Sequence, residues 1–343
     1  MSATAPRTDR AWVGGRLHTG LVELTESLEV LDGGCRPGHW VVVVPYDEAP
    51  VCARFAEVAI GPLPAGVGRW SGPPASAWAS SLDRDAFEKG VAVVRERIAA
   101  GDVYQVNLCR TLSAPSGPGA DPWALAEVLA RANPAPHAAV VDLPSAGWWV
   151  VSASPELFLE RRGPVVTSGP VKGTAPAPGA FLDKDVAENV MIVDLVRNDL
   201  GRVCATGSVE VTALCVPEAH PGLWHLVSRV RGRLRPGAGW ADLLDAAFPP
   251  GSVTGAPKRA ATAVIAELEP GGRSVYTGAV GWVDAATGDG CLSVAIRTFW
   301  HRHGRLRFGT GGGITWGSDP SGEWAETELK AARLLGAASG GGR

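Results

Sequence analysis

Residues 183–202 read DKDVAENVMIVDLVRNDLGR, and they predict an amphipathic helix with carboxylates at its start. Apolar residues follow Glu188 at three, four and seven positions, which is the spacing of one helical face. Asp185 stands three residues before Glu188, so the two carboxylates share that face. The stretch therefore predicts a helix over 183–198 whose apolar stripe begins beside an acidic pair.

The stretch GPVKGT at 169–174 stands just upstream and carries Lys172 in a predicted tight turn between Pro170 and Gly173. An exposed loop lysine is one interpretation, because most lysines are exposed. A nucleophile or base is the other, since desolvation beside a cation lowers the pKa of an amine toward its neutral, reactive form. The residues alone leave both interpretations open.

The acidic spacing recurs near the C-terminus, where EWAETELK occupies 323–330. Glu323 and Glu326 are again three apart, and Lys330 lies one turn further along a predicted helix. A solvated helix face is the alternative to a ligand site for each acidic pair. If both pairs point inward, four carboxylates repel one another, and a hard cation with oxygen ligands such as Mg²⁺ would relieve the repulsion.

Two glycine-rich stretches are GTGGG at 309–313 and GSVTGAPK at 251–258. Neither matches the dinucleotide fingerprint or the P-loop, so neither predicts a nucleotide site. Both can present backbone N–H groups to a carboxylate, and Pro257 places the second stretch at the positive end of a helix. His225 stands alone, and a core histidine and a functional one remain equally open.

Helical and strand-like segments alternate along the chain. Helices are predicted from Asp83 to Gly101 and over 121–132, 183–198, 240–247, 257–268 and 323–335. Strands are predicted at 40–44, 58–60, 103–108, 148–152, 157–160, 209–211, 275–283, 291–300 and 305–309. Hairpin signals at 284–290 and 303–304 favour antiparallel pairing over repeated βαβ units. We expect a short β-rich N-terminal segment, 1–80, packed on the same domain as a catalytic region, 81–338.

The composition limits the class of protein. A net charge of −3 over 343 residues argues against nucleic acid or a membrane surface as the main partner. The longest aliphatic run is Trp40 to Val44, and the first residues form no apolar leader. Six cysteines without a CxxC or zinc-ligand spacing suit thiols in a reducing compartment. These features predict a cytoplasmic protein.

The motifs, taken together, resemble the chorismate-utilising enzymes and within them the aminodeoxychorismate synthases. They keep the family's order over roughly residues 86–336. The matching stretches are GDVYQVNL at 101–108, SPELF at 154–158, PVKGT at 170–174, the stretch at 183–202, HLVS at 225–228, GSVTGAPK at 251–258, AIRT at 295–298, GGGI at 311–314 and EWAETELK at 323–330. The resemblance implies an α+β fold of two large antiparallel β-sheets packed together, with helices outside and the site in a cleft.

The resemblance also implies roles for single residues. Glu188 and Glu326 would hold Mg²⁺, with Asp185 and Glu323 acting directly or through water. The metal and the glycine backbone would bind the ring carboxylate, and His225 would lie near the ring hydroxyl that leaves. Arg297 and Tyr276 would take the enolpyruvyl carboxylate. The full set of substrate-binding residues is Gln105, Gly173, Thr174, Thr254, Tyr276, Arg297, Gly311, Gly312, Gly313 and Lys330.

Two positions indicate the reaction. Gln105 stands where water-using relatives have a lysine, which implies ammonia as the nucleophile. Lys172 stands where anthranilate synthases commonly have alanine. In aminodeoxychorismate synthases this lysine is thought to attack ring C2 while the C4 hydroxyl leaves, with the residue matching Glu156 as general acid. Ammonia then adds at C4 and expels the lysine, so the implied product from chorismate is 4-amino-4-deoxychorismate, a precursor of 4-aminobenzoate in a folate or secondary-metabolite pathway.

Two alternatives are kept. One is an anthranilate synthase component I. The other is a non-catalytic family member that serves as a binding or regulatory subunit, although the key lysines, Arg297 and both metal glutamates are intact. Cys291 lacks the neighbours of a glutaminase elbow. A separate glutamine amidotransferase subunit is therefore predicted as the source of ammonia.

Overall fold

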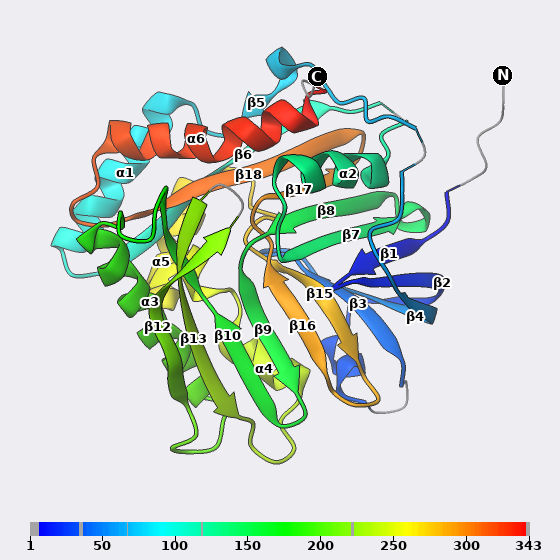
Figure 1. Cartoon of the computed structure of the whole chain (residues 1–343). Coiled ribbons are helices and arrows are strands. Elements are labelled where there is room, and N and C mark those ends of the chain that lie inside the picture. The colour runs from blue at the N-terminus through cyan, green and yellow to red at the C-terminus, as the bar shows by residue number, and fades with distance from the viewer. Residues whose placement is uncertain (1–6, 34–36, 67, 118, 221–222, 341–343) are drawn as a thin grey trace.

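The computed structural model describes residues 7–33, 37–66, 68–117, 119–220 and 223–340. In these ranges 18 strands join one sheet, every pairing between named strands is antiparallel, and six α-helices cover its outer faces (Figure 1). The predicted α+β class is therefore confirmed. The structure departs from the expectation of two sheets in one respect: hydrogen bonds between strands join both into a single network.

The helices fall close to their predicted ranges. They are α1 Arg84–Ala99, α2 Pro122–Ala132, α3 Asp183–Gly201, α4 Trp240–Ala247, α5 Lys258–Leu268 and α6 Pro320–Ala338. Side-chain caps explain several starts. The Asp83 carboxylate accepts a hydrogen bond from the Ala86 N–H at 2.8 Å, and Asp319 caps α6 in the same way through Gly322.

The strands of the first half of the chain are β1 Arg10–Val13, β2 Arg16–Thr25, β3 His39–Val44, β4 Val51–Ile60, β5 Ala79–Ser80, β6 Gln105–Pro115, β7 His137–Leu143, β8 Trp148–Ser154, β9 Leu157–Arg162 and β10 Val165–Gly169. Those of the second half are β11 Val171–Ala175, β12 Glu210–His220, β13 Leu223–Arg233, β14 Gly255–Ala256, β15 Ala279–Asp284, β16 Gly290–Val294, β17 Thr298–Arg302 and β18 Arg305–Ile314. Ten of these 18 strands overlap a predicted strand. The other eight were not predicted: β1, β2, β5, β7, β10, β11, β13 and β14.

The N-terminal strands join the two halves of the sheet. Strand β3 pairs with β15 in the half that contains β16, β9, β10 and β13. Strand β1 pairs with β7 in the half that contains β8, β17, β18 and β6. Strands β4 and β2 connect them. Residues from these strands thus complete the sheet, while a boundary near residue 80 stays a prediction.

Two kinds of core hold the layers together. Strand β3 is buried on both faces: Trp40 and Val42 pack toward α3 and α4, and Val41 and Val43 pack into the space between the two halves of the sheet. Helix α1 and α5 cover β6, and α2 and α6 cover β8 and β17. Alternation along one strand therefore supplies both a helix–sheet core and a sheet–sheet core.

One predicted strand is wrong as a continuous element. The run 291–300 is divided into β16 and β17, because Arg297 between them adopts a left-handed conformation with φ of 52°. The apolar pattern continues through the break, so it gives no sign of the bend. Conversely, the glycines after residue 309 extend β18 to Ile314, where a strand was predicted to end at 309.

The described cysteines, Cys52, Cys109, Cys204, Cys215 and Cys291, are all free thiols, while Cys35 lies outside the described residues. No helix in the described ranges is long and apolar enough to cross a membrane.

Candidate active site

Helices α3 and α6 bring the two predicted acidic groups together. Burial raises the pKa of Glu188, the nearby Lys172 opposes that shift, and the charge of Glu326 adds to it. The Lys172 Nζ lies 3.8 Å from the Glu188 Oε2, and the Lys330 Nζ lies 2.7 Å from the Glu326 Oε1. Although α3 and α6 are far apart in sequence, their carboxylates and lysines thus form one charged cluster.

Glu323 belongs to the same cluster and is buried. Burial raises the pKa of Glu323, a hydrogen bond from the Ser318 hydroxyl lowers it, and Glu326 raises it again. The Ser318 Oγ donates to the Glu323 Oε1 at 2.6 Å. Burial acts to raise the pKa of Glu326, but the charge and hydrogen bond of Lys330, with the charges of Lys184 and Lys172, together make the net shift downward. Within this cluster, therefore, the pKa of Glu323 is raised and the pKa of Glu326 is lowered.

Asp185 has another contact. Its Oδ2 accepts a hydrogen bond from the Leu182 N–H at 2.9 Å, which caps the first turn of α3. Its Cβ lies 2.9 Å from where a side chain on Gly173 would begin, so it packs against strand β11, which carries Lys172. The structure places Asp185 at the entrance of α3, and its predicted metal contact stays a prediction.

The fit of a metal ion can be judged from the donors. Within the described ranges, no group of three or more histidine, cysteine, aspartate or glutamate side chains is arranged to hold one. Glu188 and Glu326 nevertheless offer carboxylate oxygens from two helices and repel each other. Two carboxylates completed by water suit the preferences of Mg²⁺, so the donor chemistry fits this ion.

Lys172 lies on strand β11 and not in a free tight turn. Strand β11 pairs with β13, and the register shifts between Lys172 and Thr174 because Gly173 adopts φ of 70°. The lysine side chain is only 12 % exposed. A side chain on Gly313 would begin 3.6 Å from its Nζ, so the amine faces the glycine strand β18. The interpretation as an exposed loop lysine is wrong.

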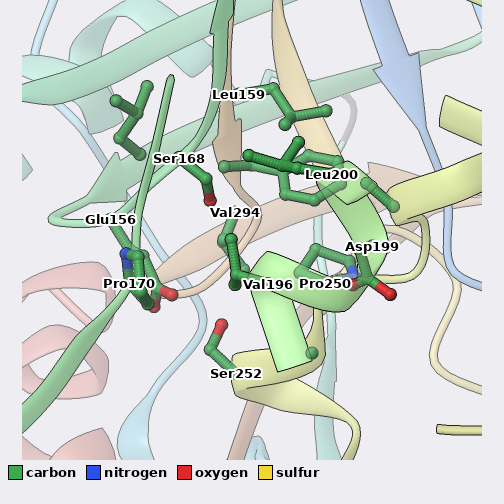
Figure 2. Close-up of a pocket in the computed structure, with 14 residues that line it drawn as sticks. Glu156, Leu159, Ser168, Pro170, Val196, Asp199, Leu200, Pro250, Ser252 and Val294 are labelled. Carbon is green, nitrogen blue, oxygen red and sulfur yellow. The ribbon is translucent and has the colours of Figure 1, made fainter. Parts of the chain in front are cut away.

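Glu156 follows β8 and is buried beside Lys172. Burial raises its pKa to about 7, although a hydrogen bond from Ser252, the charge of Lys172 and the Val171 backbone all act to lower it. Glu156 lines a cavity of about 10 Å³, room for one water molecule. Figure 2 shows Glu156 and Pro170 on one side of this cavity and Asp199 on the other. The carboxyl is thus partly protonated near neutral pH, as a general acid requires.

The glycines of β18 allow other groups to approach the strand closely. Gly313 lies opposite Asn107 of β6, and a side chain on it would overlap the Gln105 amide nitrogen. A side chain on Gly312 would begin 3.0 Å from the Glu323 Oε2. Among the described residues, no hydrogen-bond partner reaches the buried Gln105 Oε1, so an acceptor is available beside Lys172. The Gly311 carbonyl accepts from Lys330 at 3.1 Å.

His225 lies on β13 opposite Thr174 and is buried. Its Nδ1 is 3.1 Å from both the Gly173 carbonyl oxygen and the Thr174 hydroxyl. Because a carbonyl only accepts, we assign the proton to Nδ1. These contacts fix the ring against the backbone that carries Lys172.

Three further residues predicted to bind the substrate lie in different surroundings. Arg297 is half-buried, and burial together with the nearby charge of Arg333 lowers its pKa. In the described part of the chain no hydrogen bond or ion pair involves its guanidinium, so this cation is available to an anion. The Thr254 hydroxyl donates to the Pro250 carbonyl at 2.7 Å. Tyr276 lies in the core between the sheet halves, and burial raises its pKa well above 10. The structure thus shows Thr254 and Tyr276 as parts of the frame around the site.

Several contributors were missed from sequence. Ser252 hydrogen-bonds Glu156. The charge of Lys184 acts to lower the pKa of both Glu323, whose net shift is upward, and Glu326, whose net shift is downward. Ser252 lies inside the glycine-rich stretch 251–258, which was the available signal. Lys258 of that stretch is instead structural, because its Nζ bonds both Asp199 and the Ala247 carbonyl at 2.7 Å.

Comparisons with known proteins identify the family of this chain. The sequence profile of the chorismate binding enzyme family matches residues 69–336. An aminodeoxychorismate synthase from Streptomyces griseus is 43 % identical over 74 % of this chain and 36 % of its own length. An aminodeoxychorismate synthase component 1 from Klebsiella aerogenes is 40 % identical over 76 % of this chain and 59 % of its own. An anthranilate synthase component 1 from Streptomyces coelicolor is 41 % identical over 75 % and 52 %. The matches span between a third and three fifths of these curated relatives.

Solved structures give the same fold. The anthranilate synthase component I of Streptococcus pneumoniae superposes with a TM-score of 0.80 at 25 % identity, covering 98 % of this chain and 94 % of that one. The menaquinone-specific isochorismate synthase of Escherichia coli superposes with a TM-score of 0.78 at 18 % identity, which shows a shared fold alone. The resemblance expected from the motifs is confirmed: the chain belongs to the chorismate binding enzyme family.

Proposed function

We propose that this chain is an aminodeoxychorismate synthase component I. It would replace the C4 hydroxyl of chorismate by ammonia and keep the enolpyruvyl group. One observation carries the proposal: the charge of Lys172 acts on the buried Glu156, whose pKa is about 7, and the Lys172 amine lies 3.8 Å from Glu188. The named relatives of both synthase types support the substrate class.

The chemistry follows from these two residues. The nitrogen lone pair of Lys172 forms a bond to ring C2, the ring double bond shifts, and the C4–O bond breaks. Glu156 gives its proton to the leaving hydroxyl, which departs as water. Ammonia then bonds to C4, the double bond returns, and the C2–N bond to Lys172 breaks. The surplus proton of the incoming nitrogen restores Glu156, so atoms and charge balance.

The other site residues would bind and orient. Arg297 would pair with the side-chain carboxylate, and the Gly311 to Gly313 backbone with Lys330 would face the ring carboxylate. Mg²⁺ held by Glu188 and Glu326, with Asp185 and Glu323 contributing directly or through water, would supply positive charge at that carboxylate. The remaining substrate-binding positions stay as predicted, with His225, Gly173 and Thr174 next to Lys172.

Ammonia is the proposed nucleophile because Gln105 offers an acceptor and no charged base at the position where a water-activating lysine would stand. A separate glutamine amidotransferase subunit would supply it. The name component 1, which several relatives carry, supports a partner subunit.

The main competitor is an anthranilate synthase component I, because a relative of that name is 41 % identical. Purified protein is incubated with chorismate, Mg²⁺ and ammonium salt, and the products are identified by mass and ultraviolet spectrum. The proposal predicts 4-amino-4-deoxychorismate without pyruvate release. Anthranilate together with pyruvate would refute it, and metal-dependent chorismate binding without turnover would favour a non-catalytic role.

A further inference from the structure

We infer that Arg273, paired with Glu269, is a positioning residue of the substrate cleft: this buried ion pair sets the spacing of three backbone segments that carry Gln105, Thr254 and Tyr276. The inference rests on the proposed function only for the identity of the substrate. Neither Arg273 nor Glu269 belongs to the lysine and carboxylate cluster of the site.

Arg273 is buried and every donor of its guanidinium is used. Its Nε and Nη2 bond the two Glu269 oxygens at 2.7 and 2.6 Å. Its Nη2 also donates to the Asn107 carbonyl at 2.6 Å, and its Nη1 donates to the Val253 carbonyl at 2.9 Å and the Thr277 hydroxyl at 3.3 Å. Five N–H groups thus meet five acceptor contacts in one fixed fork.

Each of these acceptors adjoins a predicted site residue. Asn107 stands on β6 two residues after Gln105, Val253 precedes Thr254, and Thr277 follows Tyr276. Glu269 holds β6 at a second point, because its Oε1 accepts from the Cys109 N–H at 2.7 Å. The ion pair therefore holds all three segments through groups close to the site residues. Among the described residues, its hydrogen bonds involve none of the site side chains, and only its charges act on the Tyr276 hydroxyl.

Backbone hydrogen bonds extend the same frame. The Asn107 N–H donates to the Thr254 carbonyl at 2.8 Å, and the Thr277 N–H donates to the Ala295 carbonyl at 2.9 Å. Ala295 stands two residues before Arg297, the unpaired cation of the cleft. A change in the Arg273 fork would thus shift the side of the cleft proposed to bind the substrate carboxylates.

A buried ion pair is an expensive way to gain stability. Its desolvation cost often cancels the attraction, and apolar residues of similar volume frequently serve as well or better. Such a pair can, however, fix the positions of the groups around it, because arginine offers five donors in a rigid plane and lysine does not. The saturated fork at Arg273 is therefore better explained by positioning than by a contribution to the free energy of unfolding.

The test compares three variants with wild type: Arg273→Lys, Glu269→Gln, and the double variant Arg273→Met with Glu269→Leu, which leaves no buried charge unpaired. The matched control is Arg7→Lys, which alters another arginine paired with a buried carboxylate, Asp142, away from the cleft. For each protein we measure KM and kcat for chorismate, the melting temperature, and the far-ultraviolet circular dichroism at the assay temperature.

We expect kcat/KM for chorismate to fall about 10- to 100-fold in every folded variant, mainly through KM, as for a displaced binding frame. The control should stay within about twofold of wild type. The inference is overturned if a folded variant keeps the wild-type KM, or if all three fail to fold, because the pair then serves the fold alone. The comparison of kcat/KM between each variant and wild type remains valid whichever product wild type makes from chorismate. If wild type does not turn over, the dissociation constant for chorismate replaces KM.

Discussion

Glu156 shows how a single residue acquires a catalytic property from its surroundings. Its motif could be predicted from sequence, but its burial and its bond to Ser252 could not, because β8 and the stretch 251–258 meet only in the fold. The same holds for Lys172, whose motif is clear while its contact with Glu188 depends on α3 packing beside β11. Sequence thus names both residues, while packing sets the contacts of Lys172 and the pKa of Glu156.

The raised pKa of Glu156 makes activity depend on pH. A general acid must carry its proton, so kcat should fall as pH rises above about 7, the pKa of the buried carboxyl. Glu156→Gln should lower kcat about 10²- to 10⁴-fold, because the amide cannot supply a proton. A pH–rate profile of both proteins checks this. An unchanged rate in the variant would remove Glu156 from the reaction.

The same shift predicts an effect on stability. A carboxyl whose folded pKa lies above its unfolded value of 4.5 contributes fully below that value, and the contribution is lost as pH rises through about 7. Glu156→Gln should therefore melt at a higher temperature than wild type at pH 8. At pH 4.5 the two should agree much more closely. Glu26→Gln, at an exposed position, is the control, and an equal melting temperature at pH 8 would contradict the burial argument.

At the scale of elements, helices were the easiest to predict, because each has a local apolar stripe and often a local cap. The division between β16 and β17 was not predictable, since Arg297 is held in its left-handed conformation by neighbours from distant strands. Strand β18 is a middle case. Its glycines are evident in the sequence. Why they are needed is seen only in the structure, where Gln105 of β6 and Lys172 of β11 lie close to Gly313.

That close approach can be tested at Gly313. Gly313→Ala fits the strand backbone but would displace the Gln105 amide and crowd the Lys172 amine. We expect kcat/KM for ammonium to fall about tenfold or more. The control is Gly317→Ala, because a side chain there would meet nothing within 4 Å in the described structure. Equal losses in both variants would indicate a general effect of alanine and not a role of the strand surface.

At the scale of the whole molecule, the hairpin signals predicted antiparallel pairing and the family resemblance implied the α+β class, but neither predicted that the two sheet halves are joined. Strands β1–β4 link two strands that lie far apart in the sequence, β7 on one side and β15 on the other. A pattern of residues along one strand gives its buried faces but not its partners. The charged cluster that α3 and α6 form depends on this pairing between strands that are distant in the sequence.

This linkage predicts that residues 81–338 do not fold alone. Without β1–β4, the edges of β7 and β15 would be exposed together with the apolar core that β3 buries on both faces. The fragment should lack a cooperative melting transition and should aggregate on size-exclusion chromatography, whereas the full chain should elute as a folded species. A monomeric fragment that melts like the full chain would show that the N-terminal strands are dispensable.

The central claim is that the Lys172 amine acts on a ring held against the glutamates of α3 and α6. The measurement is the turnover of Lys172→Ala at saturating chorismate, Mg²⁺ and ammonium, with Lys89→Ala on the exposed face of α1 as the matched control. The account predicts that kcat of Lys172→Ala falls by several orders of magnitude, while its fold and the control's kcat are unchanged. A Lys172→Ala protein that forms the same product at the wild-type rate would contradict it.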